Sequence, residues 1–176
     1  MARAHAISVL LDDDLLTFNR VIGVVRRRNV PISGLATSAS HTPGVSRLSF
    51  IMQTDDASID RLVRQLQKSF GVRHAETFPA EHAVTREIAL IKVRTDPDDR
   101  VAFLAVVSQF EATVVDEGAA ACILEIAGPT DRADACIRAL EPFGILEIAR
   151  SGAVAMRSAD GSSPSPATYN PSEAVL

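Results

Sequence analysis

Cysteine is scarce in this chain, which has two cysteines, Cys122 and Cys136, among 176 residues. Their spacing matches neither a metal-binding motif nor a disulfide framework. Cys122 stands in an alternating apolar segment, and Cys136 stands on the apolar side of a helical one. Because unpaired cysteine is usually buried, we expect both to be small core residues.

Long apolar runs and a large cluster of positive charge are also missing. No segment approaches the ~20 apolar residues that a membrane-spanning helix requires, and the N-terminus lacks the basic start and apolar middle of a signal peptide. The net charge of −4 comes from residues of both signs, and the arginines are scattered. A nucleic-acid-binding surface is therefore not expected. These absences predict a cytoplasmic protein that binds neither membranes nor nucleic acids.

No catalytic grouping is evident either. The four histidines are dispersed among predicted strand ends and loops, and none stands with an acid and a nucleophile. The acidic run Asp12–Asp14 could bind Mg²⁺ only with oxygen ligands from elsewhere, and no second acidic cluster has a suitable spacing. We predict instead that these acids end a strand and begin a helix, where carboxylates accept hydrogen bonds from unpaired N–H groups.

The chain does have 47% hydrophobic residues, which is enough for a buried core. The spacing of these residues switches along the chain between the alternation typical of strands and the three- or four-residue spacing typical of helices. The first half predicts a strand over residues 7–11, a helix, two strands, a second helix and a last strand. The first helix is expected to bury Leu15, Phe18, Ile22 and Val25. The other elements are the strands Ile32–Ser40, Val45–Gln53 and Val72–Phe78 and a helix that carries Ile59, Leu62, Val63 and Leu66.

After a polar joint at Pro79–Thr85, the same order of elements begins again. Asp96 is expected to be the N-cap of a helix that has Pro97 at its first position, and Thr130 is expected to cap the next helix. The inward residues of the first of these helices are predicted to be Val101, Leu104 and Val107. The strands of this half are Glu87–Val93, Ala112–Glu117, Ala121–Ala127 and Ile145–Arg150.

Each half is therefore predicted to be a ferredoxin-like βαββαβ unit, in which an antiparallel four-stranded sheet carries both helices on one face. The fold class is α+β, with one unit at residues 5–79 and a second at residues 86–157. Residues 158–176 are rich in serine, proline and alanine. Such a composition cannot offset the entropy of ordering, so we predict a disordered tail.

Four separated sequence blocks point to one protein family. They are Arg20-Val21-Ile22-Gly23, Ser46-Arg47, Arg86–Val93 and Ala149-Arg150-Ser151-Gly152. Over roughly residues 5–157 the chain resembles the small, regulatory subunits of acetolactate synthase (acetohydroxyacid synthase). The resemblance implies an N-terminal ACT domain followed by a C-terminal ACT-like domain.

The resemblance also implies a function without catalysis. Such a subunit binds and activates a separate acetolactate synthase large subunit in the biosynthesis of valine, isoleucine and leucine. The thiamine diphosphate, Mg²⁺ and FAD of the family belong to that large subunit, so no cofactor is expected here. A homodimer through the ACT domains is expected, since pairing covers exposed strand edges. One alternative stays open, a stand-alone amino-acid-sensing ACT protein that regulates a different enzyme.

The family holds its feedback amino acid between two subunits, at the turn before the first helix. The resemblance places Asp13 at the usual asparagine of this turn, Leu16 at the usual glycine and Pro31 at a second asparagine. Leu16 adds a side chain where the ligand would lie, and an ionised Asp13 would repel a carboxylate. Pro31 offers neither a side-chain amide nor a backbone N–H. These replacements predict weakened or altered valine feedback.

Further residues are candidates for the effector site or the subunit interface. Asn29 stands two residues before Pro31 and would need a strand shift of two to replace the missing amide. Arg47 is expected to point outward from its strand and to build subunit contacts, although a solvated arginine remains the alternative. The full set of these additional candidates is Asp12, Asp14, Thr17, Asn29, Ile32 and Arg47.

Overall fold

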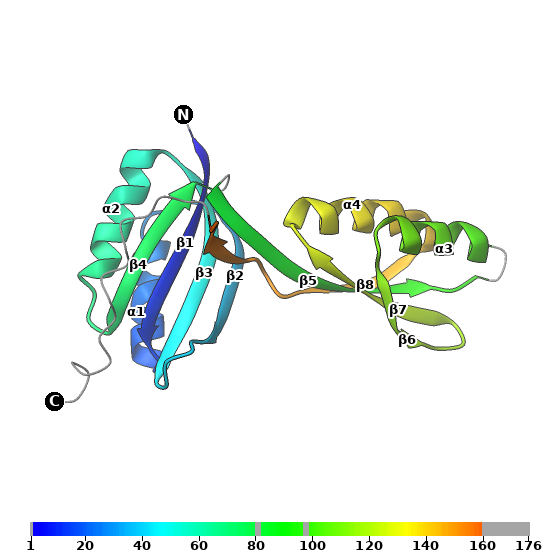
Figure 1. Cartoon of the computed structure of the whole chain (residues 1–176), viewed down its shortest axis with the longest axis horizontal. Coiled ribbons are helices and arrows are strands. Elements are labelled where there is room, and N and C mark those ends of the chain that lie inside the picture. The colour runs from blue at the N-terminus through cyan, green and yellow to red at the C-terminus, as the bar shows by residue number, and fades with distance from the viewer. Residues whose placement is uncertain (1, 80–81, 97–98, 160–176) are drawn as a thin grey trace.

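The protein consists of two α+β units, each with an antiparallel sheet and two helices (Figure 1). The structure is a computed structural model that describes residues 2–79, 82–96 and 99–159. The ferredoxin-like fold class predicted from the sequence is confirmed. Apart from Ser158 and Ala159, the predicted tail lies outside the described residues.

The first unit is built on a four-stranded sheet in the order β2-β3-β1-β4. Its central strand β1 pairs antiparallel with both β3 and β4. A helix follows the first and the third strand, as βαββαβ connectivity requires. The elements are β1 (Arg3–Asp12), α1 (Leu15–Arg26), β2 (Ile32–Ala39), β3 (Val45–Thr54), α2 (Asp56–Gln67) and β4 (Val72–Pro79).

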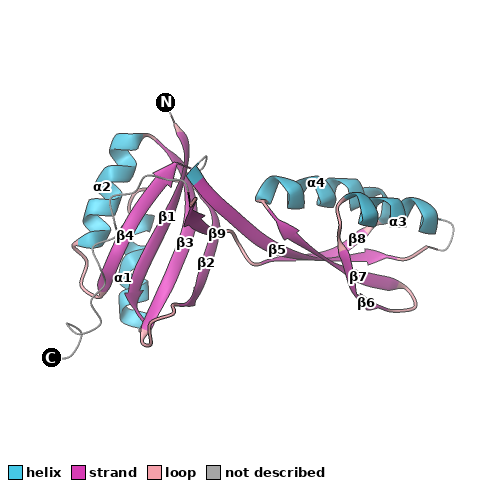
Figure 2. Ribbon diagram, viewed as in Figure 1, coloured by secondary structure: helices cyan, strands magenta, loops and turns pink. Residues whose placement is uncertain are grey.

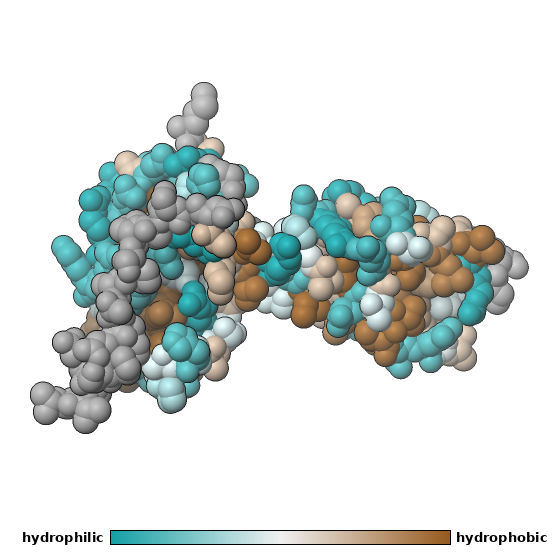
Figure 3. Space-filling model, viewed as in Figure 1, coloured by the Kyte–Doolittle hydropathy of each residue, from teal (hydrophilic) through white to brown (hydrophobic). Residues whose placement is uncertain are grey.

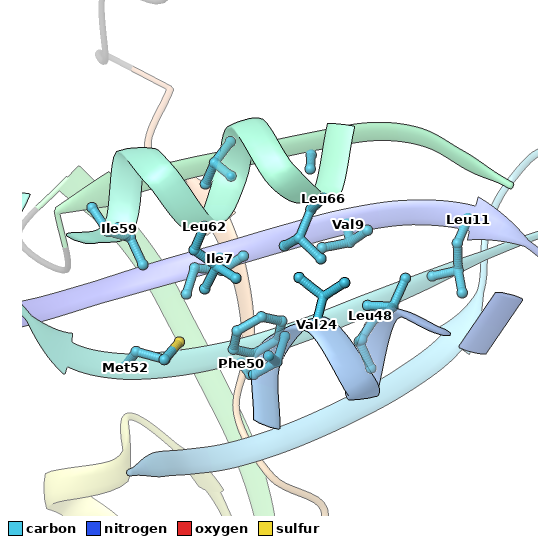
Figure 4. Packing of buried hydrophobic residues seen from close by; sticks show 14 residues of the cluster. Ile7, Val9, Leu11, Val24, Leu48, Phe50, Met52, Ile59, Leu62 and Leu66 are labelled. Carbon is cyan, nitrogen blue, oxygen red and sulfur yellow. The ribbon is translucent and has the colours of Figure 1, made fainter. Parts of the chain in front are cut away.

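Hydrophobic side chains from the sheet and both helices form the core of this unit (Figure 4). Ile7, Val9 and Leu11 alternate along β1 and are at most 1% exposed. They meet the buried face of α2, which consists of the predicted Ile59, Leu62, Val63 and Leu66. The period-two pattern of the strand and the helical spacing of α2 therefore bury the expected residues.

The buried face of α1 differs in part from the prediction. Leu15 is 79% exposed, whereas Thr17, Val21 and Val24 are buried beside the predicted Val25. The loop before β4 explains the difference. Gly71 in that loop has a φ of 83°, and a Cβ on it would lie 2.3 Å from Thr17 Oγ1. This close approach turns the Thr17 side of α1 inward and leaves Leu15 outside.

The second unit repeats the topology with a sheet in the order β6-β7-β5-β8. Its core includes Ile91, Leu124 and Ile126, and Cys122 and Cys136 are buried in it, as predicted. The elements are β5 (Ala83–Arg94), α3 (Arg100–Gln109), β6 (Thr113–Glu117), β7 (Ala121–Gly128), α4 (Thr130–Leu140), the 3₁₀ turn η3 (Glu141–Phe143), β8 (Ile145–Arg150) and β9 (Val154–Arg157).

The face that α3 turns to the core is not the predicted one. Val101 is 85% exposed and Leu104 is 47% exposed, although Val107 packs partly against the core. Phe103 is buried instead, and its ring meets that of Phe143 edge-on at 5.7 Å. Because an aromatic ring buries more apolar area than a valine, the position of Phe103 sets the rotation of the helix.

Two helix starts also differ from the prediction. Asp99 occupies the N-cap of α3, where Asp96 was expected, and Pro97 lies outside the described residues. Pro129, rather than Thr130, occupies the N-cap of α4. Since β7 continues to Gly128, Pro129 alone is left to turn the chain into the helix. Thr130 is then the first helical residue, and its hydroxyl lies 3.4 Å from a carboxylate oxygen of Glu87.

The predicted polar joint at Pro79–Thr85 is shorter than expected, because β5 already begins at Ala83. The first residues of β5 pair with β9, from Ala83 with Arg157 to Arg86 with Val154. Figure 2 shows β9 beside the start of β5 and against the first sheet. The sequence did not predict β9, which has only four residues.

β9 covers part of the sheet face that lies opposite α1 and α2. Ala6 and Phe78 point away from the helices, and both are buried together with Ala155 of β9. Arg157 extends over the Phe78 ring at 5.1 Å and pairs with Glu76 at 3.2 Å. β9 thus belongs to the packing of both units.

A close backbone contact continues this cover over β2. Gly152 has a φ of 75°, and a Cβ on it would lie 2.7 Å from the carbonyl oxygen of Leu35. A Cβ on Gly34 would likewise lie 2.9 Å from the backbone nitrogen of Ala153. Glycine at these two positions allows the chain to cross β2 in contact with it.

The corresponding face of the second sheet is open among the described elements. Along β5, Ala89 and Ile91 are buried on the helix side, while Ile88 and Leu90 on the other side are 46% and 41% exposed. Figure 3 shows hydrophobic surface over parts of the second unit, whereas the surface around α2 is mostly hydrophilic. In the described ranges, no helix has both the length and the hydropathy needed to cross a membrane.

Candidate functional site

The turn between β1 and α1 holds the acidic run Asp12–Asp14. Asp14 is the N-cap of α1, with an extended backbone (φ −139°, ψ 149°), and its carboxylate accepts a hydrogen bond from the Thr17 backbone N–H at 2.8 Å. This bond is the main reason that the pKa of Asp14 lies below its usual value. The predicted capping role of the run is therefore confirmed for Asp14.

The other two carboxylates of the turn bind neighbouring segments. Asp12 forms an ion pair with Arg73 of β4 at 2.6 Å. Asp13 accepts a hydrogen bond from the Ser46 hydroxyl at 2.7 Å, and its backbone N–H donates to the Gly44 carbonyl at 3.0 Å. The turn is thus tied to the start of β3 and to β4, and all three carboxylates have partners within the chain.

The first turn of α1 presents large apolar side chains to solvent. Leu15 and Leu16 are 79% and 76% exposed, and Phe70, in the loop before β4, is 81% exposed. Arg20 lies over the Phe70 ring at 5.6 Å and donates a hydrogen bond to the Phe70 carbonyl oxygen. Thr17, the neighbouring candidate, is buried against Gly71.

The remaining effector candidates lie at the other end of the first sheet. Asn29 adopts a φ of 51° after the end of α1, Pro31 is exposed, and Ile32 begins β2 opposite Met52. β2 spans roughly 20 Å between Ile32 and the end that neighbours Asp13. One chain therefore does not bring Asp13 and Leu16 together with these residues. A site that used both groups would have to form between two chains.

Arg47 points to the sheet face opposite the helices. Its guanidinium donates a hydrogen bond to the hydroxyl of Ser8 at 2.6 Å, across the β1–β3 pair. Ser8 is buried, at 2% exposed, and Arg47 is half-buried. The arginine is therefore positioned by the sheet and is not freely solvated, while its predicted role in subunit contacts stays a prediction.

A network of charged residues that the sequence analysis missed lies in the second unit. Arg150 of β8 donates hydrogen bonds to Glu87 of β5 and to Asp134 of α4, the latter at 2.7 Å. Burial alone would lower the pKa of Arg150, but these bonds outweigh it and raise the pKa overall. Glu87 is buried because it shares the inward register of Ala89 and Ile91. The alternation of Glu87 with Ala89 and Ile91 is the sequence signal that could have predicted a buried, paired glutamate.

The two cysteines have a structural position. Cys122 on β7 and Cys136 on α4 face the core of the second unit, and burial is the main cause that raises the pKa of both thiols. No group of three or more metal-ligating side chains occurs in the described part of the chain. The features that the described residues offer here are hydrogen-bonded turns and open surfaces.

Comparison with known proteins assigns both halves. A family model described as "Small subunit of acetolactate synthase" matches residues 86–159, and a model of the ACT domain matches residues 13–75. The acetolactate synthase small subunit of Mycolicibacterium smegmatis is 34% identical over 152 residues, which are 86% of this chain and 89% of that protein. The Bacillus subtilis small subunit is 32% identical over 138 residues, covering 78% and 80%.

The fold agrees with this assignment. The crystal structure of the acetolactate synthase small subunit from Thermotoga maritima superposes with a TM-score of 0.80 and 33% sequence identity. The superposition covers 89% of this chain and 98% of that one. Sequence similarity along most of the chain and the same two-unit architecture show that this protein belongs to the family of acetolactate synthase small subunits.

Proposed function

We propose that this chain binds and activates a thiamine-diphosphate-dependent acetolactate synthase large subunit, with weakened or altered valine feedback. The observation that carries the proposal is the match of both units to small subunits along 86% of the chain. The match at residues 86–159 favours this role over a stand-alone amino-acid sensor, because that model describes small subunits and not ACT domains in general.

Activation by a separate subunit is a linkage effect. The chain raises the rate only if it binds the active state of the large subunit more tightly than the inactive state. The thiamine diphosphate, Mg²⁺ and FAD belong to the large subunit in this proposal, and no described residue of this chain is assigned to them. Residues 5–79 are proposed as the ACT domain and residues 86–157 as the second domain. A cytoplasmic location remains a prediction.

We expect the chain to act as a homodimer that is joined through its first unit. Among the described residues, β2 and β4 are the edges of the first sheet, and the outer side of each edge has no strand partner there. Leu15, Leu16 and Phe70 add exposed apolar area next to α1. A two-fold dimer that uses these surfaces would place Asp13 and Leu16 of one chain near Pro31 and Ile32 of the other.

The weakened feedback follows from the contacts of the turn. Asp13 is held by the Ser46 hydroxyl and keeps its carboxylate at the place that the resemblance gives to an amide. Leu16 projects its side chain outward, at 76% exposed. Two lost hydrogen bonds to a charged group cost roughly 1.5–3 kcal/mol each, so valine affinity should fall by about two to four orders of magnitude.

An activity assay tests the regulatory role. The purified chain should form no acetolactate, and adding it in excess should raise the turnover of its cognate large subunit. Acetolactate formation by the isolated chain, or an unchanged large-subunit rate at saturating chain concentration, would refute the role.

Calorimetry combined with amide NMR shifts tests whether valine binding at the β1–α1 turn is weakened. Valine should not shift the amides of Asp13 and Leu16 in the unmodified protein. The triple change Asp13→Asn, Leu16→Gly and Pro31→Asn should restore binding at that turn, whereas Asp60→Asn on α2, which removes a similar exposed charge, should not. Tight valine binding that shifts Asp13 and Leu16 in the unmodified chain would show that the turn still recognises the amino acid.

A further inference from the structure

The turn between β1 and α1 has a structural counterpart between β5 and α3, because the two units share one topology. In the first unit, Asp12, Asp13 and Asp14 all have partners within the chain. In the second unit, the equivalent place holds a cavity of about 260 Å³. It lies at the end of the second unit that is farthest from the first (Figure 1).

The inner wall of this cavity is apolar. Phe103 of α3 and Phe143 of η3 meet edge-on there, and Cys122 of β7 is buried beside them. Leu104 and Val114 continue the wall toward the opening and are 47% and 39% exposed. A ligand in the cavity would therefore bury an apolar group against aromatic and aliphatic side chains.

The rim carries charges of both signs. Arg100 faces Glu117 across 3.9 Å. Arg94 and Asp99 also line the cavity, and within the described ranges no hydrogen bond or ion pair engages the Arg94 guanidinium or the Asp99 carboxylate. Asp99 stands at the N-cap of α3, yet its side chain makes no capping bond. One cation and one anion are thus available to a ligand.

These features select among ligand classes. A polyphosphate would meet the acids of the rim, and the volume of about 260 Å³ is below that of sites for drug-sized molecules. A purely apolar molecule would make no use of Arg94 and Asp99. A small zwitterion with an apolar side chain satisfies both charges and the apolar wall.

We propose that this cavity binds an α-amino acid with an apolar side chain. Arg94 takes the ligand carboxylate as a donor of paired N–H groups, Asp99 accepts from the ligand ammonium, and Phe103 and Phe143 contact the side chain. The site goes beyond the proposed regulatory role and needs neither the large subunit nor a ligand at the β1–α1 turn. It would give the second unit, to which no effector site has been assigned, an amino-acid site of its own.

Titration of the full chain with L-leucine tests the proposal by calorimetry. Leucine should bind at one site per chain, while 4-methylpentanoate, which lacks the ammonium, and 3-methylbutylamine, which lacks the carboxylate, should each bind at least about tenfold more weakly. Arg94→Gln and Asp99→Asn should each weaken leucine binding by a similar factor. Arg138→Gln on α4 and Asp60→Asn on α2 are matched controls that should not change it. All four residues are exposed, so the variants should fold.

Amide NMR shifts locate the site. Leucine should shift the amides of Phe103 and Cys122 and leave those of Asp13 and Leu16 in place. The proposal is overturned if leucine does not bind at millimolar concentration, if Arg94→Gln binds it as well as the unmodified chain, or if the shifts are confined to Asp13 and Leu16. The last result would contradict the feedback reading as well, whereas the first two leave the regulatory role untouched.

Discussion

The two units share their order of elements but differ in how they use the outer face of the sheet. In the first unit the central strand is buried on both sides, with Ile7 toward the helices and Ala6 under β9. In the second unit Ile91 is buried toward the helices, while Leu90 on the other side is 41% exposed. A repeated topology therefore does not fix how much surface each copy buries.

The turns before the first helix of each unit also differ, in whether their carboxylates are hydrogen-bonded within the chain. Asp13 is tied to Ser46, and Asp14 caps α1. In the second unit Asp99 stands at the N-cap of α3 without a side-chain bond and borders a cavity. The same topology therefore places a hydrogen-bonded carboxylate at one turn and an N-cap without a side-chain bond, beside a cavity, at the other.

The largest difference in stability between the two units should come from truncating, in each, a residue on the sheet face opposite the helices. Phe78→Ala removes a ring that is 1% exposed beneath Arg157, and it should lower the free energy of unfolding by about 3–5 kcal/mol. Leu90→Ala on the open face of β5 should cost less than about 1 kcal/mol. Urea unfolding followed by circular dichroism measures both. Equal losses would show that the second face is also covered.

The cover over β2 should be sensitive to one methyl group. Gly152→Ala places a Cβ 2.7 Å from the Leu35 carbonyl oxygen. It should lower the free energy of unfolding by about 1–2 kcal/mol for its positive φ and by about 1–3 kcal/mol more for the overlap. Gly44→Ala is the control, because Gly44 also has a positive φ, of 72°, and nothing lies within 4 Å of the added Cβ.

Hydrogen exchange at the amides of β9 and of the first residues of β5 should report the same change. Gly152→Ala should lower protection there, since β9 is the strand that the Gly152 turn directs onto the first sheet. If Gly44→Ala is as costly as Gly152→Ala and protection at β9 is unchanged, the crossing is not held by close contact.

A smaller effect should appear in acid, where the helix caps of the two units differ. A hydrogen bond from the Thr17 backbone N–H is the largest cause that lowers the pKa of Asp14. For Asp55, the largest cause that lowers the pKa is a hydrogen bond from the Ser58 hydroxyl. Both pKa values lie below 3.8 in the folded protein. Their contribution to stability is therefore complete above about pH 3.8 and is lost as the pH falls through the folded-state values.

The double change Asp14→Asn and Asp55→Asn keeps a good N-cap residue and removes this titration. Exchange at the amides of α1 and α2 should then depend less on pH below about 3.8 than in the unmodified protein. The amides of α3, which has no side-chain cap, should behave alike in both proteins. A difference in α3 would assign the effect to something other than the caps.

The smallest expected effect concerns coupling between the units. Both cysteines lie in the second unit, and burial raises the pKa of their thiols, so alkylation should be slow and should report the opening of that unit alone. Because the cluster that buries both cysteines is separate from the one that Phe78 forms with Ala6 and Ala155, Phe78→Ala should leave the alkylation rate unchanged. A faster rate would show that β9 transmits opening from one unit to the other.

Much of the fold was predictable because the signals are local. The strand over residues 7–11 and the helical spacing of Ile59, Leu62, Val63 and Leu66 are read from nearby residues, and the structure confirms them. The faces of α1 and α3 were less predictable, since Thr17 is turned inward by Gly71 and Phe103 by its contact with Phe143. Those partners are distant in the sequence.

The candidate site shows the same division. Local capping rules predicted the role of Asp14, and a resemblance located Asp13, Leu16 and Pro31, whereas only the structure shows that Asp13 is held by Ser46. The bonds of Arg150 to Glu87 and Asp134 were not predicted, because charge pairing across strands and helices depends on register.

Apart from β9, the sequence by itself determined the order of strands and helices in both units, because hydrophobic period and turn residues act over a few neighbouring positions. Only the tertiary structure decided which faces are covered, with Arg157 over Phe78 and Gly152 against Leu35. It also decided that a cavity opens beside Asp99, while Asp13 in the equivalent turn is hydrogen-bonded to Ser46. These outcomes depend on contacts between residues that are far apart along the chain, and no local pattern encodes them.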